Sequence, residues 1–564
     1  MSSPLREPFL GRKSRQQPSR IIVKDGTGDL SKFVLPSASY PIRGGVFRTM
    51  SGTSKSSTSG EKAIVEQAVQ TNGKRSAAYW KQTDKNLVAD WSYVKDEIKT
   101  QVEIAGPMVL VNLLQYSILL VSTIFAGHLG VLELASASLA NSIASVLGFY
   151  ILLGMASALE TLCGQAYGAE QYSKLGIYLQ RALIVLYATC IPLTFLFFYM
   201  EKLLLLVGQT PVISAKAGEY AIWLLPALFA YAALQPIIKF LQTQSVVMPM
   251  VICSAASLAI HVGLCWFIIY VLGMGFPGAA LATSISYWLN VVFLFLWVRK
   301  MDTCKETWGP GFTMEAFSDL KPFLKLAASS AVMICLEYWC FEIMVMLAGL
   351  LTDPELELSA LSICLNTVTL NYMIPFGLSA AASTRVSNTL GAGEPNAARV
   401  SVYVVVGISL LQAMTISGSL LLARNVWGWV FSSDPEVVAY VATIMPIIAV
   451  LALFDGIQGV LSGVSRGAGW QDLGALVNLG TFYAVGVPVG VLLAFHFEWS
   501  GKGLFTGLIV GLGLQMMTLA LITFKTNWMK QAEKAAALVY HAEAALDDPE
   551  KLLIENHNGG KAGD

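Results

Sequence analysis

Charged residues are scarce in this chain. Asp, Glu, Lys and Arg make up only 13% of its 564 residues, 55% of the residues are hydrophobic, and the mean hydropathy is +0.60. A soluble domain of average composition has about 25% charged residues, so the composition excludes an ordinary soluble domain and indicates a membrane protein. The net charge is zero, which gives no sign of a nucleic-acid partner.

The sequence also lacks the motifs of several enzyme and metal-binding classes. Its eight cysteines form no CxxC pair, and its five histidines show no metal-ligand spacing. A phosphate-cradling glycine loop of the type GxxxxGKS or GxxxxGKT is missing. We therefore expect no enzyme activity, no ATP-driven pumping within this chain, no metal site and no cofactor.

Long apolar stretches dominate the rest of the sequence. About twelve of them are long enough to cross a bilayer, which takes about 20 residues each. All should be helices, because lipid offers the backbone no hydrogen-bond partners. The predicted spans are 104–125, 139–159, 182–206, 221–240, 246–271, 279–298, 326–351, 361–382, 400–422, 437–464, 475–495 and 504–524.

The membrane part falls into two halves between polar ends. Residues 1–95 predict a disordered cytoplasmic tail, and residues 526–564 predict a cytoplasmic C-terminal tail that begins with a surface helix. Six spans are expected in residues 96–300 and six in residues 323–525, with a cytoplasmic loop at 301–322 joining them. Basic residues are more frequent in the loops that this arrangement places inside, so both termini are predicted to be cytoplasmic.

Two segments indicate an internal duplication. Residues 154–169 and 377–392 share their leading glycine, an alanine, a threonine and the closing Gly-Ala pair. Six spans per half is an even number, so both halves insert in the same orientation. Such repeats are related by an axis along the membrane normal, and the substrate site lies near their interface. We predict an all-α membrane protein with about twelve transmembrane helices in two pseudo-symmetric six-helix bundles.

Three acidic residues lie deep in the apolar spans of the second half. They are Glu337, Glu342 and Asp455, and no basic residue is near them in the sequence. A charge at the bilayer centre costs roughly 2.5–3.5 kcal/mol on insertion scales, and burial favours the protonated form of a carboxyl group. Such groups can load protons from an acidic compartment and release them into a neutral one. We predict that Glu337 and Asp455 couple protons to transport.

Neighbouring residues refine this prediction. Asp455 shares a helix face with Gln458 by i,i+3 spacing, and Asn366 is a candidate hydrogen-bonding neighbour. Glu342 lies roughly 140° around the helix from Glu337, so packing is as well founded a role for it as proton handling. At the offset of the repeat, the first half has Gln115 opposite Glu337 and a neutral residue opposite Asp455. Ion coupling is therefore expected in the second half.

Further polar residues are candidates for structural or gating roles. Glu160 lies at the cytoplasmic end of the second span. We expect it either to have a structural or gating role or to handle protons, and a basic residue such as Arg181 or Arg385 to pair with it. Asn141 matches Asn366 in the repeat and is assigned, with Gln115, to gating or structure.

Aromatic residues cluster around the predicted proton site. Tyr338 and Tyr372 would form part of an aromatic wall that suits a flat, cationic or aromatic solute. Packing against lipid is the alternative for any one of these side chains.

At these residues the chain resembles plant-type members of the multidrug and toxic compound extrusion (MATE) family over residues 95–525. The resemblance implies two six-helix bundles in a V that opens alternately to each side, with proton handling by acids that match Glu337 and Asp455, beside Asn366. Many bacterial members have an aspartate in the first helix where this chain has Ser122. The matching motifs are 126–130, 159–169, 335–342, 362–367, 385–393 and 461–471.

These observations predict a proton-coupled antiporter that exports small organic solutes, such as secondary metabolites or xenobiotics, by alternating access. The alternatives are a channel or facilitator whose acids only tune ion preference, and a lipid-headgroup flippase on the same fold. The expected partners are an organic solute, protons and the lipid bilayer, without nucleic acid, and the chain is expected to act as a monomer. The predicted location is the vacuolar or the plasma membrane.

Overall fold

A computed structural model gives the structure of this protein. The predictions for residues 1–89 and 545–564 lie outside the described residues. The structure describes residues 90–544 except 302–303, 309–310, 312, 352–353 and 433. Within this part of the chain, twelve helices are long and apolar enough to cross a membrane, which confirms the predicted number of spans and their all-helical character.

The first half is built from helices that are joined by short turns. Its elements are α2 (Trp91–Leu129), α3 (Val131–Ala144), the π-helical η1 (Ser145–Phe149), α4 (Tyr150–Ala156), α5 (Ala158–Gly168), α6 (Tyr172–Phe198), α7 (Met200–Leu206), α8 (Pro211–Thr243), α9 (Met248–Trp266), the π-helical η2 (Phe267–Val271) and α10 (Phe276–Lys300). The second span is therefore the continuous run α3–η1–α4–α5.

The second half repeats this arrangement after a linker. Its elements are α11 (Lys305–Trp308), the 3-10 turn η4 (Met314–Phe317), α12 (Leu320–Ala348), α13 (Pro354–Gly391), α14 (Pro395–Trp427), the 3-10 turn η5 (Gly428–Val430), α15 (Pro435–Ala468), α16 (Gln471–Asn478), the π-helical η6 (Leu479–Gly486), α17 (Val487–Val491), the π-helical η7 (Leu492–His496), α18 (Ser500–Lys525) and α19 (Trp528–Ala544). The predicted loop at 301–322 thus contains short helical turns.

Most helices are longer than the apolar stretches that predicted them. The first span begins at Trp91, 13 residues before the predicted 104, and its added turns include Glu97. Glu97 is only 3% exposed because Arg385 pairs with it. A hydropathy window stops at such polar residues, whereas the helix continues wherever tertiary partners satisfy them.

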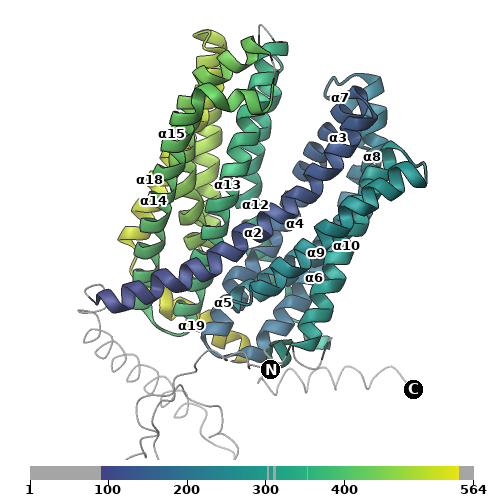
Figure 1. Cartoon of the computed structure of the whole chain (residues 1–564). Coiled ribbons are helices and arrows are strands. Elements are labelled where there is room, and N and C mark those ends of the chain that lie inside the picture. The colour runs from purple at the N-terminus through teal and green to yellow at the C-terminus, as the bar shows by residue number, and fades with distance from the viewer. Residues whose placement is uncertain are drawn as a thin grey trace, which may run out of the picture. The chain divides into compact units, whose positions relative to one another are not determined.

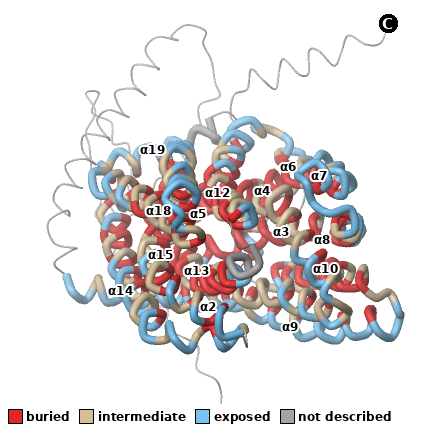
Figure 2. The backbone as a smooth tube through the Cα atoms, turned by 90° about the horizontal axis from the view of Figure 1, so that it is seen from above, coloured by how far each residue is buried: buried red, intermediate tan, exposed pale blue. Residues whose placement is uncertain are grey.

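The two halves form separate helical bundles within the compact unit Lys81–Asp564. Figure 1 shows α12, α13, α14, α15 and α18 gathered on one side and α3, α6, α8, α9 and α10 on the other, with the two groups diverging toward the top of the view. Buried residues line the interior of both bundles, and exposed residues lie on the outside (Figure 2). Large apolar side chains are exposed there, including Leu422 at 89% and Val131 at 86%, as expected for helices surrounded by lipid.

Matching glycines bring the two halves together. An added Cβ at Gly154 would lie 2.5 Å from the Cα of Ala331, and one at Gly377 would lie 2.8 Å from the backbone nitrogen of Val109. The second span of each half therefore packs against the first span of the other half. This reciprocal packing explains why the leading glycine recurs in the two similar segments.

The closing glycines of the same segments permit an even closer approach of α5 and α13. A Cβ at Gly391 would lie 2.0 Å from the carbonyl oxygen of Gln165, and one at Gly168 would lie 1.9 Å from that of Asn388. Both obstacles are backbone atoms, so rotation of a side chain cannot relieve the clash.

We expect Gly391→Ala to lower the stability of the folded protein by about 1–3 kcal/mol, the usual cost of overpacking. A reduced melting temperature of the purified protein would show this. Gly407→Ala in α14 is the matched control, since no atom lies within 4 Å of its added Cβ and replacing an interior helical glycine is otherwise favourable. Equal melting temperatures for the two variants would contradict the close packing of the halves.

The helix α19 follows the last span and contacts both halves. Its buried side chains Trp528, Ala532, Ala535 and Val539 recur at helical spacing along one face. The Lys174 ammonium of α6 donates to the carbonyl oxygen of Val539 at 2.7 Å.

Candidate functional site

Glu337 lies at the meeting point of three helices in the second half. It is 8% exposed and projects from α12. The hydroxyl of Tyr372 in α13 donates to its Oε1 at 3.3 Å, and the amide of Gln458 in α15 donates to its Oε2 at 3.1 Å. The predicted grouping of Glu337 with Gln458 and Tyr372 is therefore present in the fold.

Asp455 lies one helical turn before Gln458 on α15 and is 1% exposed. Its Oδ2 atom is buried and has no hydrogen-bond partner. Among the ion pairs of the described residues, none includes Asp455 or Glu337. Gln458, which is fully buried, also donates to Ser462 Oγ at 3.0 Å. Gln458 therefore binds Glu337 and lies one turn from Asp455, and neither acid is paired with a cation among the described residues.

The structure does not bring every predicted residue to these acids. Asn366 is exposed on α13 and makes no hydrogen bond to either acid. Asn141 lies in the first half, where its amide reaches Thr123 Oγ1 at 3.5 Å. Gln115 of α2 has a buried Nε2 atom without a partner.

The opposite face of α12 contacts the first half. Ser142 of α3 donates to Glu342 at 2.7 Å, and the Trp339 indole donates to the Val146 carbonyl oxygen at 3.1 Å. One turn away, the rings of Tyr338 and Tyr150 stack with their centroids 4.3 Å apart. Glu342 therefore points toward the other half, as its angular separation from Glu337 predicts.

A row of aromatic rings leads away from Glu337. Tyr338 meets Tyr372 edge-on with the ring centroids 6.2 Å apart, and Tyr372 stacks with Phe376 at 5.7 Å. The Lys239 ammonium lies 5.7 Å from the centre of the Phe376 ring. The predicted aromatic cluster thus connects the acid site to a second group of charges.

This second group is a buried cluster of Glu160, Lys239 and Arg466. Lys239 of α8 contacts Glu160 Oε1 at 2.5 Å, and Arg466 of α15 donates to Glu160 Oε2 at 2.9 Å. The side chains are 1%, 5% and 6% exposed for Glu160, Lys239 and Arg466. Because Glu160 and Lys239 belong to the first half and Arg466 to the second, this cluster links the halves.

The expected partners of Glu160 were wrong. Arg385 instead pairs with Glu97 of α2, at 2.6 Å, and Arg181 donates to the carbonyl oxygen of Glu315 at 3.2 Å in the linker. The sequence distance to a basic residue did not identify the partner, since helix packing brings Arg466 to Glu160 from the other half.

Polar side chains surround the charged cluster and complete its hydrogen bonds. Arg466 also donates to Ser379 Oγ at 2.6 Å, and Lys239 donates to the side-chain oxygen of Gln242 at 3.2 Å. Gln242 in turn donates to the Ala380 carbonyl oxygen of the second half at 3.2 Å. The cluster is therefore a hydrogen-bonded contact between the halves as well as an ion pair.

Sequence reasoning missed Lys239 and Arg466. The available signal was the same as for the acids, because Lys239 lies in the apolar run 234–241 and Arg466 follows the apolar tenth span. A basic residue in or beside an apolar span is costly to bury unless it is paired, so each indicated an acid partner.

Ser122, which the sequence set apart in the first helix, lies in a polar network without acidic residues. It contacts His261 Nε2 at 3.1 Å and Thr283 Oγ1 at 2.6 Å. His261 in turn contacts Ser286 Oγ at 2.8 Å. Within the described residues, no group of three or more His, Cys, Asp or Glu side chains could hold a metal ion.

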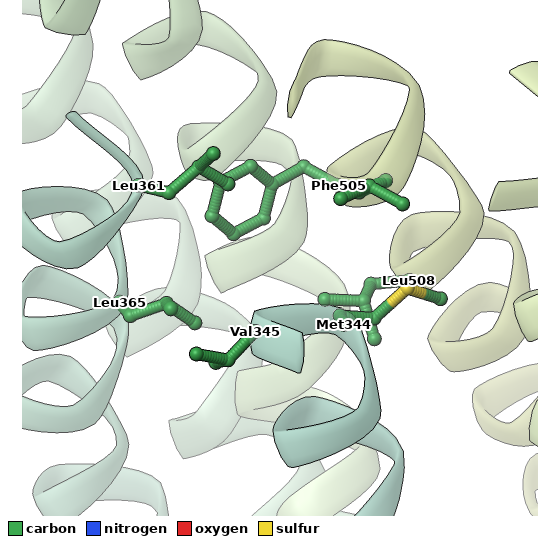
Figure 3. A pocket seen from close by; sticks show the side chains of 7 residues that line it. Met344, Val345, Leu361, Leu365, Phe505 and Leu508 are labelled. Carbon is green, nitrogen blue, oxygen red and sulfur yellow. The ribbon is translucent and has the colours of Figure 1, made fainter. Parts of the chain in front are cut away.

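A small pocket lies elsewhere in the second half (Figure 3). Its lining is wholly apolar and includes none of the predicted site residues. The lining residues are Met344, Val345, Leu361, Leu365, Leu504, Phe505 and Leu508. Without polar groups to orient a ligand, this pocket is not the candidate site.

Comparison with known proteins agrees with this architecture. The MatE family model matches residues 107–267 and 329–492. The chain is 51% identical to Protein DETOXIFICATION 16 of Arabidopsis thaliana, across 82% of this chain and 95% of that protein. It is 50% identical to Protein DETOXIFICATION 17 of the same plant, across 78% of this chain and 93% of that protein.

Solved structures share the fold. The crystal structure of the eukaryotic MATE transporter AtDTX14 matches with a TM-score of 0.77 and 45% identity, covering 79% of this chain and 99% of that chain. A mutant of the Vibrio cholerae MATE transporter VcmN matches with a TM-score of 0.68 at 18% identity, covering 79% of this chain and 99% of that one. This second likeness concerns the fold alone.

Proposed function

This chain belongs to the MatE family of membrane transporters and is not an enzyme, and from that premise we propose that it exports small organic solutes from the cytoplasm in exchange for protons. The observation that carries the proposal is the pair of buried acids. Glu337 and Asp455 are 8% and 1% exposed, belong to two helices that the Gln458–Glu337 hydrogen bond connects, and have no cation bound to them in the described part of the chain.

Proton exchange is the chemistry that suits such a pair. A buried carboxylate without a cation pays a large desolvation cost, which protonation removes. Opening of the site to an acidic compartment then loads protons, and opening to the neutral cytoplasm releases them. Gln458 donates to Glu337 and follows Asp455 by one turn, so a proton arriving at one acid changes the surroundings of the other.

The two faces of α12 give this exchange a route to the rest of the protein. One face holds Glu337 against α13 and α15, and the other places Tyr338, Trp339 and Glu342 against the first half. A rotation or bend of α12 on protonation would alter both contacts together. This coupling supports alternating access, in which the two halves rearrange about the site.

The contact between the halves near Glu160 is proposed to be a gate on the cytoplasmic side. Glu160, Lys239 and Arg466 lie near the ends of their spans, as do Glu97 and Arg385. With both termini in the cytoplasm, these ends face inward. Opening toward the cytoplasm would then require separation of Arg466 from Glu160.

An aromatic or cationic organic solute is the proposed substrate class. Tyr338, Tyr372 and Phe376 form consecutive ring contacts beside Glu337, and such rings stack on flat molecules and attract cations. The name DETOXIFICATION of the two plant relatives agrees with export of harmful small compounds. The acid site lies within one chain, so a monomer is sufficient, in the vacuolar or plasma membrane.

Transport by the full-length protein in proteoliposomes tests this function. A pH step would be imposed on vesicles with ethidium as an organic cation or carboxyfluorescein as an organic anion, and a pH-sensitive dye would follow protons. We expect accumulation of one of these probes against its gradient, with proton movement in the opposite direction. Downhill equilibration without proton movement would instead identify a channel or facilitator.

A further inference from the structure

Several buried side chains of α13 and α15 have polar atoms without partners, and Asn371, Asp455 and Gln458 are three of them. Asn371 of α13 is 8% exposed, yet neither its Nδ2 nor its Oδ1 forms a hydrogen bond. The same is true of Asp455 Oδ2 and Gln458 Oε1 on α15. More than 90% of buried polar groups in proteins have a partner in protein or ordered water, so a concentration of exceptions requires an explanation.

The packing of α13 against α15 follows a constant register. A Cβ at Gly467 would lie 2.5 Å from the carbonyl oxygen of Ser383, and one at Gly463 would lie 2.3 Å from that of Ser379. Each step advances four residues on both helices, so the helices run parallel here. Their backbones are in direct contact at these two levels.

The next two steps lead to the unpartnered atoms. At Gly459 an added Cβ would lie 3.6 Å from Tyr372 Cε2 and 3.7 Å from the Cβ of Pro375. One further step of four residues pairs Asp455 with Asn371. The register therefore places these two buried side chains at the same level of the α13–α15 contact.

The helices also separate toward this level. No backbone atom of α13 is among the nearest neighbours of a Cβ at Gly459, in contrast to Gly463 and Gly467. Pro375, which lies inside α13, removes a backbone hydrogen bond and favours a bend at this point. This wider backbone spacing lies one helical turn from Asp455 on α15.

One water molecule would satisfy three of these four atoms. It can accept a hydrogen bond from Asn371 Nδ2 and donate its two hydrogens to Asp455 Oδ2 and Gln458 Oε1, and buried waters typically make about three such bonds. We propose that Asn371 is a further residue of the acid site, which holds an ordered water that joins Asp455 to Gln458 and so to Glu337.

This inference rests on the proposed function and names how the two acids communicate. Gln458 already donates to Glu337, so the water completes a hydrogen-bonded path from one acid to the other. Asn371 is a positioning residue, since it acts on Asp455 through the water. It takes the role that the sequence assigned to Asn366, which lies five residues earlier and is exposed.

Few other ionisable groups surround Asp455. Glu337 of α12 and Tyr372 of α13 are within electrostatic range of it, and Arg466 lies three turns further along α15. Two other packed helices bring neutral groups to the adjacent positions of α15. Gln412 and Ala413 of α14 face Gly456, and Gly513 of α18 faces Phe454.

Infrared titration of the purified full-length protein tests the proposal without a transported substrate. The absorption of protonated carboxyl groups would be followed against pH, with Asp455→Asn identifying the Asp455 component. We expect Asn371→Ala to move the midpoint of that component upward by about one pH unit. A shift of this size corresponds to the loss of one hydrogen bond to a charged group. The direction follows because losing a donor to the ionised form favours the protonated form.

Two further variants separate this role from packing. Asn371→Leu keeps the volume but removes the amide, so it should move the midpoint as Asn371→Ala does, whereas Asn371→Ser keeps a group that binds water and should restore part of the shift. Asn425→Ala in α14 is the control, since Asn425 is exposed. Melting temperatures would confirm folding, and Asn371→Ser provides the comparison should the alanine variant not fold.

An unchanged midpoint in folded Asn371→Ala or Asn371→Leu would overturn the proposal. This failure is distinct from failure of the proposed function. The latter would appear as transport that ignores an imposed pH step in the unmodified protein, whereas an unchanged infrared midpoint leaves proton-driven transport intact and removes only Asn371 and its water.

Discussion

Replacement of Asp455 by asparagine is expected to abolish pH-driven accumulation of solute while the protein remains folded. One pH unit supplies about 1.4 kcal/mol per proton, which sustains about a tenfold solute gradient for one-to-one exchange. Asp455→Asn cannot bind or release the proton, so its solute gradient should fall to that of empty vesicles. The amide has nearly the same shape as the carboxyl group, and Asp455 takes part in no ion pair among the described residues. Accumulation in proteoliposomes under a pH step measures the effect.

Glu337→Gln is expected to give the same loss with a larger cost in stability. Glu337 accepts hydrogen bonds from both Tyr372 and Gln458, and a glutamine offers one acceptor oxygen in place of two. Glu219→Gln is the matched control, because Glu219 is an exposed acid of α8. Wild-type accumulation in both Asp455→Asn and Glu337→Gln would rule out these acids as the proton site.

Glu160→Gln is expected to destabilise the protein far more than Lys239→Gln. Loss of Glu160 leaves Lys239 and Arg466 as two buried cations without an anion, and removing one partner of a buried pair costs about 3–5 kcal/mol. Loss of Lys239 leaves the Glu160–Arg466 pair in place at 2.9 Å. The melting temperature and the yield of folded protein should therefore fall steeply in the first variant and modestly in the second.

The double variant Glu160→Gln/Lys239→Gln completes the cycle. It leaves one unpaired cation in place of two, so it should be more stable than Glu160→Gln alone. Two outcomes would show that charge does not determine how much this cluster stabilises the protein. One is an equal fall in melting temperature for the two single variants, and the other is a double variant that melts no higher than Glu160→Gln.

Much of the fold follows from the sequence because lipid restricts the choices. Apolar stretches of sufficient length must be helices in a bilayer, so hydropathy predicted twelve spans, and twelve are present in the described residues. The similar segments at 154–169 and 377–392 predicted a duplication. The ends of the helices were predicted poorly, because hydropathy does not show where a polar residue of a helix end finds a partner. Glu97 in the first turns of α2, for example, pairs with Arg385 of the other half.

The acid site was predicted in part. Burial in an apolar run marked Glu337 and Asp455 as functional candidates, and i,i+3 spacing placed Gln458 near Asp455. Asn366 had no comparable support from spacing, and the structure leaves it exposed on α13. Asn371 gave no signal in the sequence, since a neutral amide costs less in a span than a charge does and its importance depends on the register of α13 against α15.

The sequence by itself determined that this protein is a helical membrane transporter with two related halves and titratable acids in the second, because the composition and depth of residues along a helix are properties of the chain alone. Only the tertiary structure decided which residues meet. Glu160 pairs with Lys239, 79 positions away, and with Arg466, 306 positions away. Contacts at such separations depend on how the helices pack, and the hydropathy of each span carries no information about the rotation or register of its neighbours.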